Sequence, residues 1–395
     1  MSGFGTKVEG TGMSEQVRQA DMDAEALRDR IRGCLIGGAA GDALGYPVEF
    51  LPEKLIERHY GEGGIRSYAP NPDSGKAEIS DDTQMTLFTA NGVLAAETQA
   101  AAGIPCRPYR MVARAYQDWL RTQQIPFQKG SQAPRVCWLM DVPELYDRRA
   151  PGNSCLGALE RQAEQPLGDT DCIEEPQSNS KGCGGVMRAA PIALRPVPDG
   201  DMRWLQREAA QIAAITHGHS LGYMPAAVFA HIVYRLVFRQ PEMTLREIVF
   251  EAMDTAAEVF AGDGNLEALQ ELIDQAVYLS VTDRPDLENI HRLGEGWVAE
   301  ETLAIAIYCA LRYQDDFSKG LAVSVNHRGD SDSTGAVCGN ILGALTGYEA
   351  MEDKWKRDLE LSGVILEMAD DLARGCPADP AQDPDWYRKY MQAKR

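Results

Sequence analysis

Two short acidic segments carry the residues best suited to chemistry, and they lie about 250 residues apart. The first is Ser80-Asp81-Asp82-Thr83, and the second is Asp330-Ser331-Asp332-Ser333, followed by Thr334. Each segment precedes an apolar stretch with helical spacing. Carboxylate and hydroxyl oxygens are hard ligands, the kind that Mg²⁺ and Mn²⁺ prefer. If the two segments converge in the fold, they would form a site for divalent cations.

The same residues are also good helix caps, so two interpretations are open. Ser, Thr and Asp are favoured N-cap residues, and acidic residues suit the first turn of a helix. Ser80 would then cap one helix, and Asp332-Ser333 would cap another that contains Val337. One cap residue satisfies a helix end, however, and adjacent carboxylates repel each other unless a cation lies between them. Two converging Asp pairs could hold two ions about 3.5–4 Å apart.

Composition narrows the class of protein. The chain has 395 residues, of which 44% are hydrophobic, so it can bury a large core. A net charge of −20 argues against a direct nucleic-acid partner. The nine cysteines include no CxxC pair, which favours scattered thiols over a disulfide framework or a zinc site. We see neither a signal peptide nor an uncharged apolar run near the ~20 residues of a membrane span, and expect a cytoplasmic protein without a membrane partner.

Helical periodicity covers most of the chain, and alternating strand patterns are almost absent. We therefore predict a single all-α domain, a compact bundle of many helices packed orthogonally. Gly33, Gly37 and Gly41 fall on one helical face, which predicts a helix packed at close backbone distance. Residues 1–22 form a polar N-terminal arm or leader, residues 23–375 the helical domain, and residues 376–395 a C-terminal tail. The expected helices cover 23–45, a segment starting near 80, 109–121, 201–215, 221–238, 245–260, 266–279, 299–313, 317–326, a segment around 337–345, and 354–372.

Seven motifs occur in order between about Arg32 and about Tyr348. They are Gly37-xxx-Gly41-Asp42-Ala43-Leu44-Gly45, Pro47-x-Glu49, Ser80-Asp81-Asp82-Thr83-Gln84-Met85, Gly182-Cys183-Gly184-Gly185-Val186-Met187-Arg188, Thr216-His217-xx-Ser220-Leu221-Gly222-Tyr223, Gly296-Trp297-Val298-Ala299-Glu300-Glu301 and Gly329-Asp330-Ser331-Asp332-Ser333-Thr334-Gly335. Together they resemble the ADP-ribosylglycohydrolase family, whose members are all-helical. Any one motif is weak, but seven in the same order make the resemblance specific.

The resemblance implies a centre with two Mg²⁺ or Mn²⁺ ions and assigns a role to each motif. The implied metal ligands are Ser80, Asp81, Asp82, Asp330, Asp332 and Ser333. The implied catalytic groups are Glu49, on a loop over the metals, and Asp82 or Asp332, either of which would take a proton from water. The implied substrate-binding residues are Ser180, Lys181, Gly182, Cys183 and Gly184 around the diphosphate, together with His217, Gly296 and Trp297. Some family members carry Asn at the position of Cys183.

The implied activity is hydrolysis of the bond between ADP-ribose and a protein side chain, with an ADP-ribosylated protein as the partner. Arginine is our favoured acceptor, although the Thr216 to Tyr223 motif leans toward serine or ADP-ribose polymers. Two other functions remain open. The chain could be an immunity protein that neutralises an ADP-ribosyltransferase toxin by hydrolysis or by blocking it with the N-terminal arm. It could also be an inactive relative, although the presence of all four aspartates and Glu49 favours an enzyme.

Overall fold

The computed structural model describes residues 11–167, 170–239 and 243–391, with side chains from Met22 onward. This part of the chain is built from helices and contains no strand, which confirms the predicted all-α class. Only two isolated β-bridges occur in it, Ala77 with Leu359 and Gly182 with Val298. The second bridge joins two of the motif segments.

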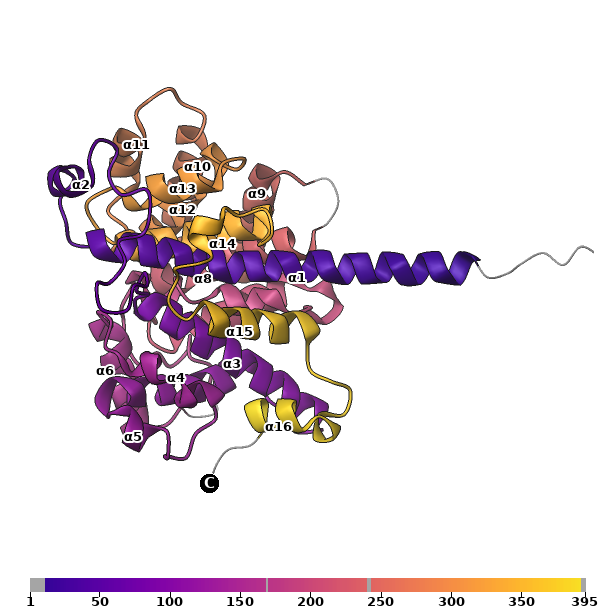
Figure 1. Ribbon diagram of the computed structural model, residues 1–395. Coiled ribbons are helices and arrows are strands. Elements are labelled where there is room, and N and C mark those ends of the chain that lie inside the picture. Colours follow the sequence, from indigo (N-terminus) through magenta and orange to yellow (C-terminus); the bar gives the residue numbers. More distant parts are fainter. Residues whose placement is uncertain (1–10, 168–169, 240–242, 392–395) are drawn as a thin grey trace, which may run out of the picture.

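Most of the helices predicted between residues 201 and 345 are present near their expected bounds (Figure 1). The short helices Glu53–Tyr60, Phe127–Gly130, Asn153–Glu164, Asp286–Leu293 and Pro384–Tyr390 were not predicted. The α-helices are α1 (Thr11–Gly45), α2 (Glu53–Tyr60), α3 (Asp81–Ala101), α4 (Pro108–Gln124), α5 (Phe127–Gly130), α6 (Asn153–Glu164), α7 (Met202–Ala214), α8 (Ser220–Phe238), α9 (Leu245–Val259), α10 (Leu266–Leu279), α11 (Asp286–Leu293), α12 (Ala299–Arg312), α13 (Phe317–Val325), α14 (Ser331–Thr346), α15 (Ser362–Arg374) and α16 (Pro384–Tyr390). Short 3₁₀ turns connect several of them, including η4 (Cys183–Gly185), η5 (Ala190–Leu194) and η7 (Asp353–Trp355).

A glycine stripe on α1 packs directly against a glycine stripe on α14. A Cβ atom on Gly37 would lie 2.3 Å from the carbonyl oxygen of Gly339, and one on Gly41 would lie 1.9 Å from that of Gly335. Neither distance is possible for a real side chain, so the two backbones touch only because both stripes lack Cβ atoms. This confirms the close backbone packing that the spacing of glycines predicted.

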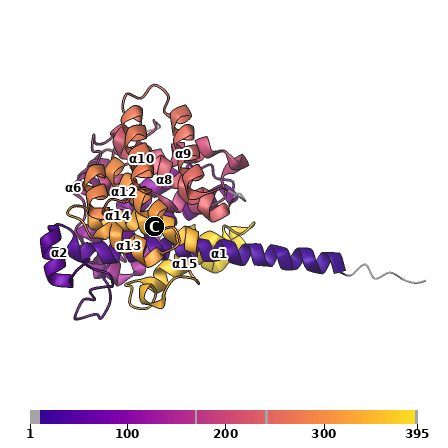
Figure 2. The ribbon, with the colours of Figure 1, turned by 90° about the horizontal axis from the view of Figure 1, so that it is seen from above.

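The start of α1 differs from the sequence expectation. The helix begins at Thr11 rather than near residue 23, so the second half of the expected polar arm is helical. Figures 1 and 2 show this part of α1 projecting beyond the other helices. The segment contains no proline, and extending an existing helix upstream is far easier than nucleating a new one. Where α1 joins the body, Arg28 and Arg32 both pair with Asp370 of α15, at 2.5 and 2.6 Å.

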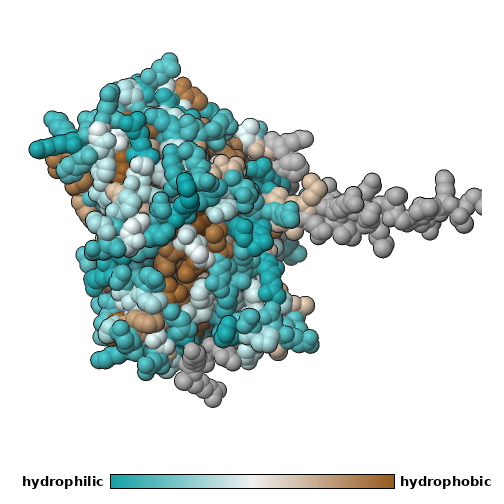
Figure 3. Space-filling model, viewed as in Figure 1, coloured by the Kyte–Doolittle hydropathy of each residue, from teal (hydrophilic) through white to brown (hydrophobic). Residues whose placement is uncertain are grey.

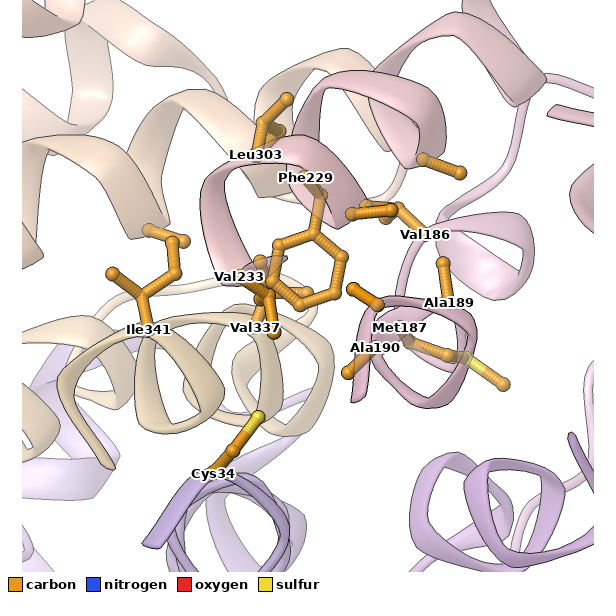
Figure 4. Packing of buried hydrophobic residues seen from close by; sticks show 14 of the residues in the cluster. Cys34, Val186, Met187, Ala189, Ala190, Phe229, Val233, Leu303, Val337 and Ile341 are labelled. Atoms are coloured by element: carbon orange, nitrogen blue, oxygen red, sulfur yellow. The ribbon is translucent and has the colours of Figure 1, made fainter. Parts of the chain in front are cut away.

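The core lies where α8, α12 and α14 meet the turn that follows η4. Figure 4 shows Phe229 and Val233 of α8 beside Val337 of α14, with Leu303 of α12 on one side. Helix α8 is long and apolar enough to cross a membrane by length and composition alone, but 83% of its apolar window is buried inside the protein. The apolar length of α8 therefore serves the core of the fold. The nine cysteines, all within the described residues, are free thiols, as expected.

Two segments depart from the predicted boundaries. The helix expected over 354–372 begins only at Ser362, because Leu361 adopts a left-handed conformation with φ 54° that breaks the helical path. Before that point the chain makes the short η7 turn, which buries Trp355. The segment 123–151 forms α5 and two 3₁₀ turns, since Pro126, Pro134 and Pro143 interrupt any longer helix. Figure 3 shows that hydrophilic residues cover most of the visible face, in keeping with the net charge of −20.

We expect Gly37→Ala to destabilise the protein by about 1–3 kcal/mol, because the added methyl group must push α1 and α14 apart. Urea denaturation followed by circular dichroism would measure the free energy of unfolding. Gly363→Ala is the matched control, since a Cβ atom at this helical position in α15 meets no atom within 4 Å. We expect it to be neutral or slightly stabilising. Equal losses in the two variants would contradict a specific glycine contact.

Candidate active site

The two acidic segments meet in the fold. The Ser333 hydroxyl donates a hydrogen bond to Asp82 Oδ2 at 2.8 Å, across 251 residues of sequence. Each segment also starts a helix: the Ser80 hydroxyl caps α3 by accepting from the Asp82 N–H, and Asp330 caps α14 by accepting from the Ser333 N–H. The cap of α14 is thus Asp330, not Asp332-Ser333 as predicted, because the helix begins at Ser331. The capping and ligand interpretations are therefore compatible.

Asp42 of α1 holds the first segment in place. Its buried carboxylate accepts hydrogen bonds from the Ser80 N–H at 2.9 Å, the Thr83 N–H at 3.1 Å and the Thr83 hydroxyl at 2.5 Å. Burial raises the pKa of Asp42 to about 6, although the bonds from Thr83 and Ser80 act in the opposite direction. Sequence reasoning assigned Asp42 no role. Its place beside Gly41, one of the close-contact glycines, was the available signal.

A pocket of about 380 Å³ opens above the meeting point of α3 and α14. It brings together most of the residues that the sequence indicated. The predicted site residues that line it are Glu49, Asp81, Asp82, Gly182, Cys183, Gly184, His217, Trp297, Asp330, Asp332 and Ser333. Carboxylates, a glycine loop and an aromatic ring therefore share one cavity, although they come from segments spread over almost 300 residues.

Four predicted site residues do not line this pocket. Ser80 lies buried beneath it as the α3 cap. The Ser180 hydroxyl accepts from the Gly182 N–H at 3.2 Å and so shapes the glycine loop. Lys181 forms an ion pair with Glu300 of α12. Gly296 adopts φ 82° and donates its N–H to Glu301. Roles for these residues toward a substrate or metal stay predictions.

The carboxyl groups in the pocket are crowded, and four of them have strongly raised pKa values. Burial, followed by the nearby charge of Asp330, raises the pKa of Glu49 to about 9. Burial raises the pKa of Asp81 to about 8, against the lowering effect of the Gly152 N–H. Burial and neighbouring carboxylates also raise the pKa values of Asp82 and Asp332 well above their usual range. Without bound cations, the site would favour protons on these groups.

This crowding fits a metal centre. Ligand atoms of Glu49, Asp330 and Asp332 all lie within 4.8 Å of one another. Glu49 Oε2 is buried without a hydrogen-bond partner among the described residues. Several buried oxygens that repel each other are stabilised by a cation of high charge, and carboxylate ligands suit Mg²⁺ or Mn²⁺. The residues present therefore fit the divalent cations that the sequence predicted.

Cys183 contributes a thiol to the pocket wall. Its Sγ atom lies 2.8 Å from Asp330 Oδ2, and burial raises the pKa of the thiol well above its usual range. The protonated thiol therefore donates to the carboxylate rather than acting as a nucleophile. This contact gives the Cys183 side chain a defined role in place of the Asn that some family members carry.

Two aromatic rings stand at the rim of the pocket. Phe50 and Trp297 stack with centroids 5.2 Å apart and an interplanar angle of 25°. Phe50 is 68% exposed and has φ 65°, an unusual backbone conformation for a residue of this size. Sequence reasoning missed Phe50, although its position directly after Glu49 was a signal. Exposed ring faces at this place suit a planar ligand group.

The segment 150–155 also lines the pocket, although sequence reasoning did not indicate it. It forms one wall of the pocket, and the Gly152 N–H donates to Asp81 Oδ2 at 3.3 Å. It begins at the end of the proline-interrupted segment 123–151, for which the sequence predicts no long helix. No sequence pattern tied this wall to the acidic segments.

The fold is all-α, and two acidic segments that each cap a helix meet in one pocket. These two features together indicate which class of protein this is. The chain belongs to the ADP-ribosylglycohydrolase family, whose model matches residues 23–381. Family membership supports hydrolysis of ADP-ribose conjugates and dependence on a metal.

Named relatives extend over almost the whole chain. The chain is 25% identical to the ADP-ribosyl-[dinitrogen reductase] glycohydrolase of Rhodospirillum rubrum, covering 89% of this chain and 98% of the relative. It is also 25% identical to human ADP-ribosylhydrolase ARH3, covering 84% of this chain and 89% of the relative. A solved structure entitled ADP-ribosylglycohydrolase-related protein complex shares the fold, with a TM-score of 0.60, 24% identity and coverage of 89% of this chain and 99% of that one.

We expect the cation-free protein to lose stability as the pH rises from about 4 toward about 9. The folded state holds protons on Glu49 and Asp81 that the unfolded chain releases near pH 4, so deprotonation in this range favours unfolding. Mn²⁺ replaces those protons and should raise the melting temperature more at pH 8.5 than at pH 5.5. Thermal unfolding with and without EDTA measures both effects.

Asp332→Asn is the informative variant for this measurement. Removing one of the crowded carboxylates should make the cation-free protein more stable at pH 8.5 than the wild type and reduce its gain with Mn²⁺. A wild-type melting temperature that is independent of both pH and Mn²⁺ would contradict a cation-binding cluster.

Proposed function

We propose that the chain is a metal-dependent hydrolase that removes ADP-ribose from modified protein side chains, with arginine as the favoured acceptor. The observation that carries the proposal is the hydrogen bond between Ser333 and Asp82, which unites both acidic segments at the floor of one pocket. Glu49 lies over this floor, and the glycine loop and the aromatic pair lie along its walls.

The cations would be held by Asp81, Asp82, Asp330 and Asp332, with hydroxyl oxygens from Ser80 and Ser333. When bound, two divalent cations supply Lewis acidity to the ribose hydroxyls and to the attacking water. Asp82 or Asp332 accepts the proton that this water releases. As the glycosidic bond breaks, its electron pair leaves with the side-chain nitrogen or oxygen, which would take up the proton that the aspartate received. Positive charge develops at the anomeric carbon, and the surrounding carboxylates would stabilise it. Glu49, whose carboxylate lies within 4.8 Å of those of Asp330 and Asp332, would act at the ribose.

The rest of the pocket suits the nucleotide part of ADP-ribose. A Cβ atom on Gly184 would lie 2.7 Å from Cε1 of His217, so only glycine leaves this wall open. Backbone without side chains allows close approach of a diphosphate. Phe50 and Trp297 offer stacked faces at the rim for the adenosine end.

The charge balance of the pocket supports arginine as the acceptor. Five carboxylates line the cavity, so even two divalent cations would leave one net negative charge. Such a site favours a guanidinium, which is cationic, over the neutral serine hydroxyl. Serine and ADP-ribose polymers are the alternative acceptors, and the same assay distinguishes them.

The test is to incubate the protein and Mn²⁺ with arginine- and serine-ADP-ribosylated peptides and to follow the release of free ADP-ribose. We expect faster release from the arginine peptide and a loss of at least about 100-fold in Asp82→Ala and Asp332→Ala. Asp353→Ala, which changes an exposed carboxylate on η7, should behave as the wild type. If neither peptide releases ADP-ribose and the wild type cannot be distinguished from the variants, the hydrolase proposal is contradicted.

A second proposal is that the chain neutralises an ADP-ribosyltransferase toxin by binding it. The observation that favours it is the projecting start of α1 (Figure 2). The helix has 35 residues and is therefore about 50 Å long, which separates its start from the pocket beside its Gly45 end. Any blocking surface there would be independent of the hydrolytic site.

Deleting residues 1–22 tests this second function. We expect peptide hydrolysis to stay within about 2-fold of the full chain, because no residue before Glu49 lines the pocket and the supporting Asp42 is retained. A purified arginine-specific ADP-ribosyltransferase should be inhibited by full-length Asp82→Ala but not by Asp82→Ala lacking residues 1–22. Equal inhibition, or none, by the two proteins would exclude the arm as a blocking element.

A further inference from the structure

A completely buried arginine lies behind the pocket, and no carboxylate of the described residues forms an ion pair with it, although the charge of Asp81 acts on it from a distance. Arg188 has no exposed surface, and its guanidinium lies 4.5 Å from the centre of the Tyr116 ring. Nη1 donates only to the sulfur atoms of Met85 and Cys155, each at 3.2 Å, and Nε has no partner among the described residues. Burying a charge with such weak compensation is unfavourable. The position of Arg188 therefore calls for a functional explanation.

The one strong hydrogen bond of Arg188 leads to the pocket. Nη2 donates to the Thr216 hydroxyl at 2.5 Å, and this same hydroxyl lies 2.8 Å from Nδ1 of His217. A guanidinium has donors only, so the Thr216 oxygen accepts from Arg188. The Thr216 hydroxyl keeps its own proton to donate, and the nitrogen within hydrogen-bond distance of it that can accept is His217 Nδ1. An uncharged imidazole that accepts at Nδ1 carries its own proton on Nε2.

The surroundings keep this imidazole uncharged. Burial, followed by the positive charge of Arg188, lowers the pKa of His217 to about 3. The side chain is only 2% exposed. Protonation would place a second cation beside Arg188 in a site that water hardly reaches, so the ring is neutral at physiological pH.

The free edge of the ring faces the glycine loop. A Cβ atom on Gly182 would lie 3.4 Å from His217 Nε2, and one on Gly184 would lie 3.1 Å from the same atom. His217 lines the pocket together with both glycines, and Nε2 has no hydrogen-bond partner among the described residues. An N–H group here is available to a ligand seated against the loop.

We infer that Arg188 and Thr216 are positioning residues that hold His217 as the neutral Nε2–H tautomer, a hydrogen-bond donor to a diphosphate oxygen of bound ADP-ribose. The identity of the ligand rests on the proposed function. The tautomer does not, because it follows from the contacts of the protein alone.

The tautomer is tested in the ligand-free protein by two-bond ¹H–¹⁵N correlation spectra of histidine-labelled samples. The six histidines are few enough for His217→Gln to assign the signal. We expect a protonated Nε2 and an unprotonated Nδ1 in the wild type and in Thr216→Ser, and a mixture of tautomers in Thr216→Val. A protonated Nδ1 or an imidazolium in the wild type, or an unchanged tautomer in Thr216→Val, would overturn the inference.

The donor role is tested by calorimetric titration with ADP-ribose and by KM and kcat. Thr216→Val should weaken ADP-ribose binding about 10-fold and raise KM with little change in kcat, whereas Thr216→Ser should stay within about 2-fold of the wild type. Thr98→Val removes an equally buried hydroxyl near the end of α3 and controls for a general loss of stability.

The outcomes separate this inference from the proposed function. Wild-type protein that binds ADP-ribose through a Thr216-dependent donor but hydrolyses no conjugate supports the inference and contradicts the hydrolase. Active wild type whose ADP-ribose affinity is unchanged in Thr216→Val, or is reduced equally in Thr98→Val, contradicts the inference and leaves the hydrolase intact.

Discussion

The contact between the glycine stripes of α1 and α14 is the constraint on which the site depends. Because the two backbones touch without side chains between them, neither helix can slide along the other without a clash. The same contact continues to the end of α1, where a Cβ atom on Gly45 would lie 2.3 Å from the Ser331 carbonyl oxygen. One turn earlier, Asp42 binds the start of α3. A single helix therefore sets the positions of both acidic segments.

Because the contact between α1 and α14 fixes both acidic segments, the fold can hold several carboxylates close to one another. Five carboxylates line one pocket, and the raised pKa values of Glu49, Asp81, Asp82 and Asp332 show how unfavourable the ionisation of these four groups is without compensation. Helix N-termini provide part of that compensation, since the segments open α3 and α14. The Cys183 thiol adds a hydrogen bond to Asp330. The repulsion that remains among these carboxylates is what bound divalent cations would relieve.

Many of the helices could be predicted, because each depends on the spacing of apolar residues along a short stretch of the sequence. Helices such as α10 matched their predicted bounds, since apolar residues at spacings of three and four mark a buried face wherever it packs. The start of α15 could not be predicted in this way, because the left-handed conformation occurs at Leu361, a residue type that gives no sequence signal for it. The helical start of α1 was missed for a different reason: a polar segment carries no periodic signal, yet it continues a helix anchored elsewhere.

By itself, the sequence determined the all-α class, the pairing of hydroxyl and carboxylate in two segments, and the close-contact glycines, because each depends on residue type and spacing along one helix. Only the tertiary structure decided which residues share the pocket. Phe50, the wall at Gly152, the support from Asp42 and the chain from Arg188 through Thr216 to His217 join groups that are distant in sequence or carry no periodic signal. Their roles arise from hydrogen bonds and burial, which exist only once the helices have packed.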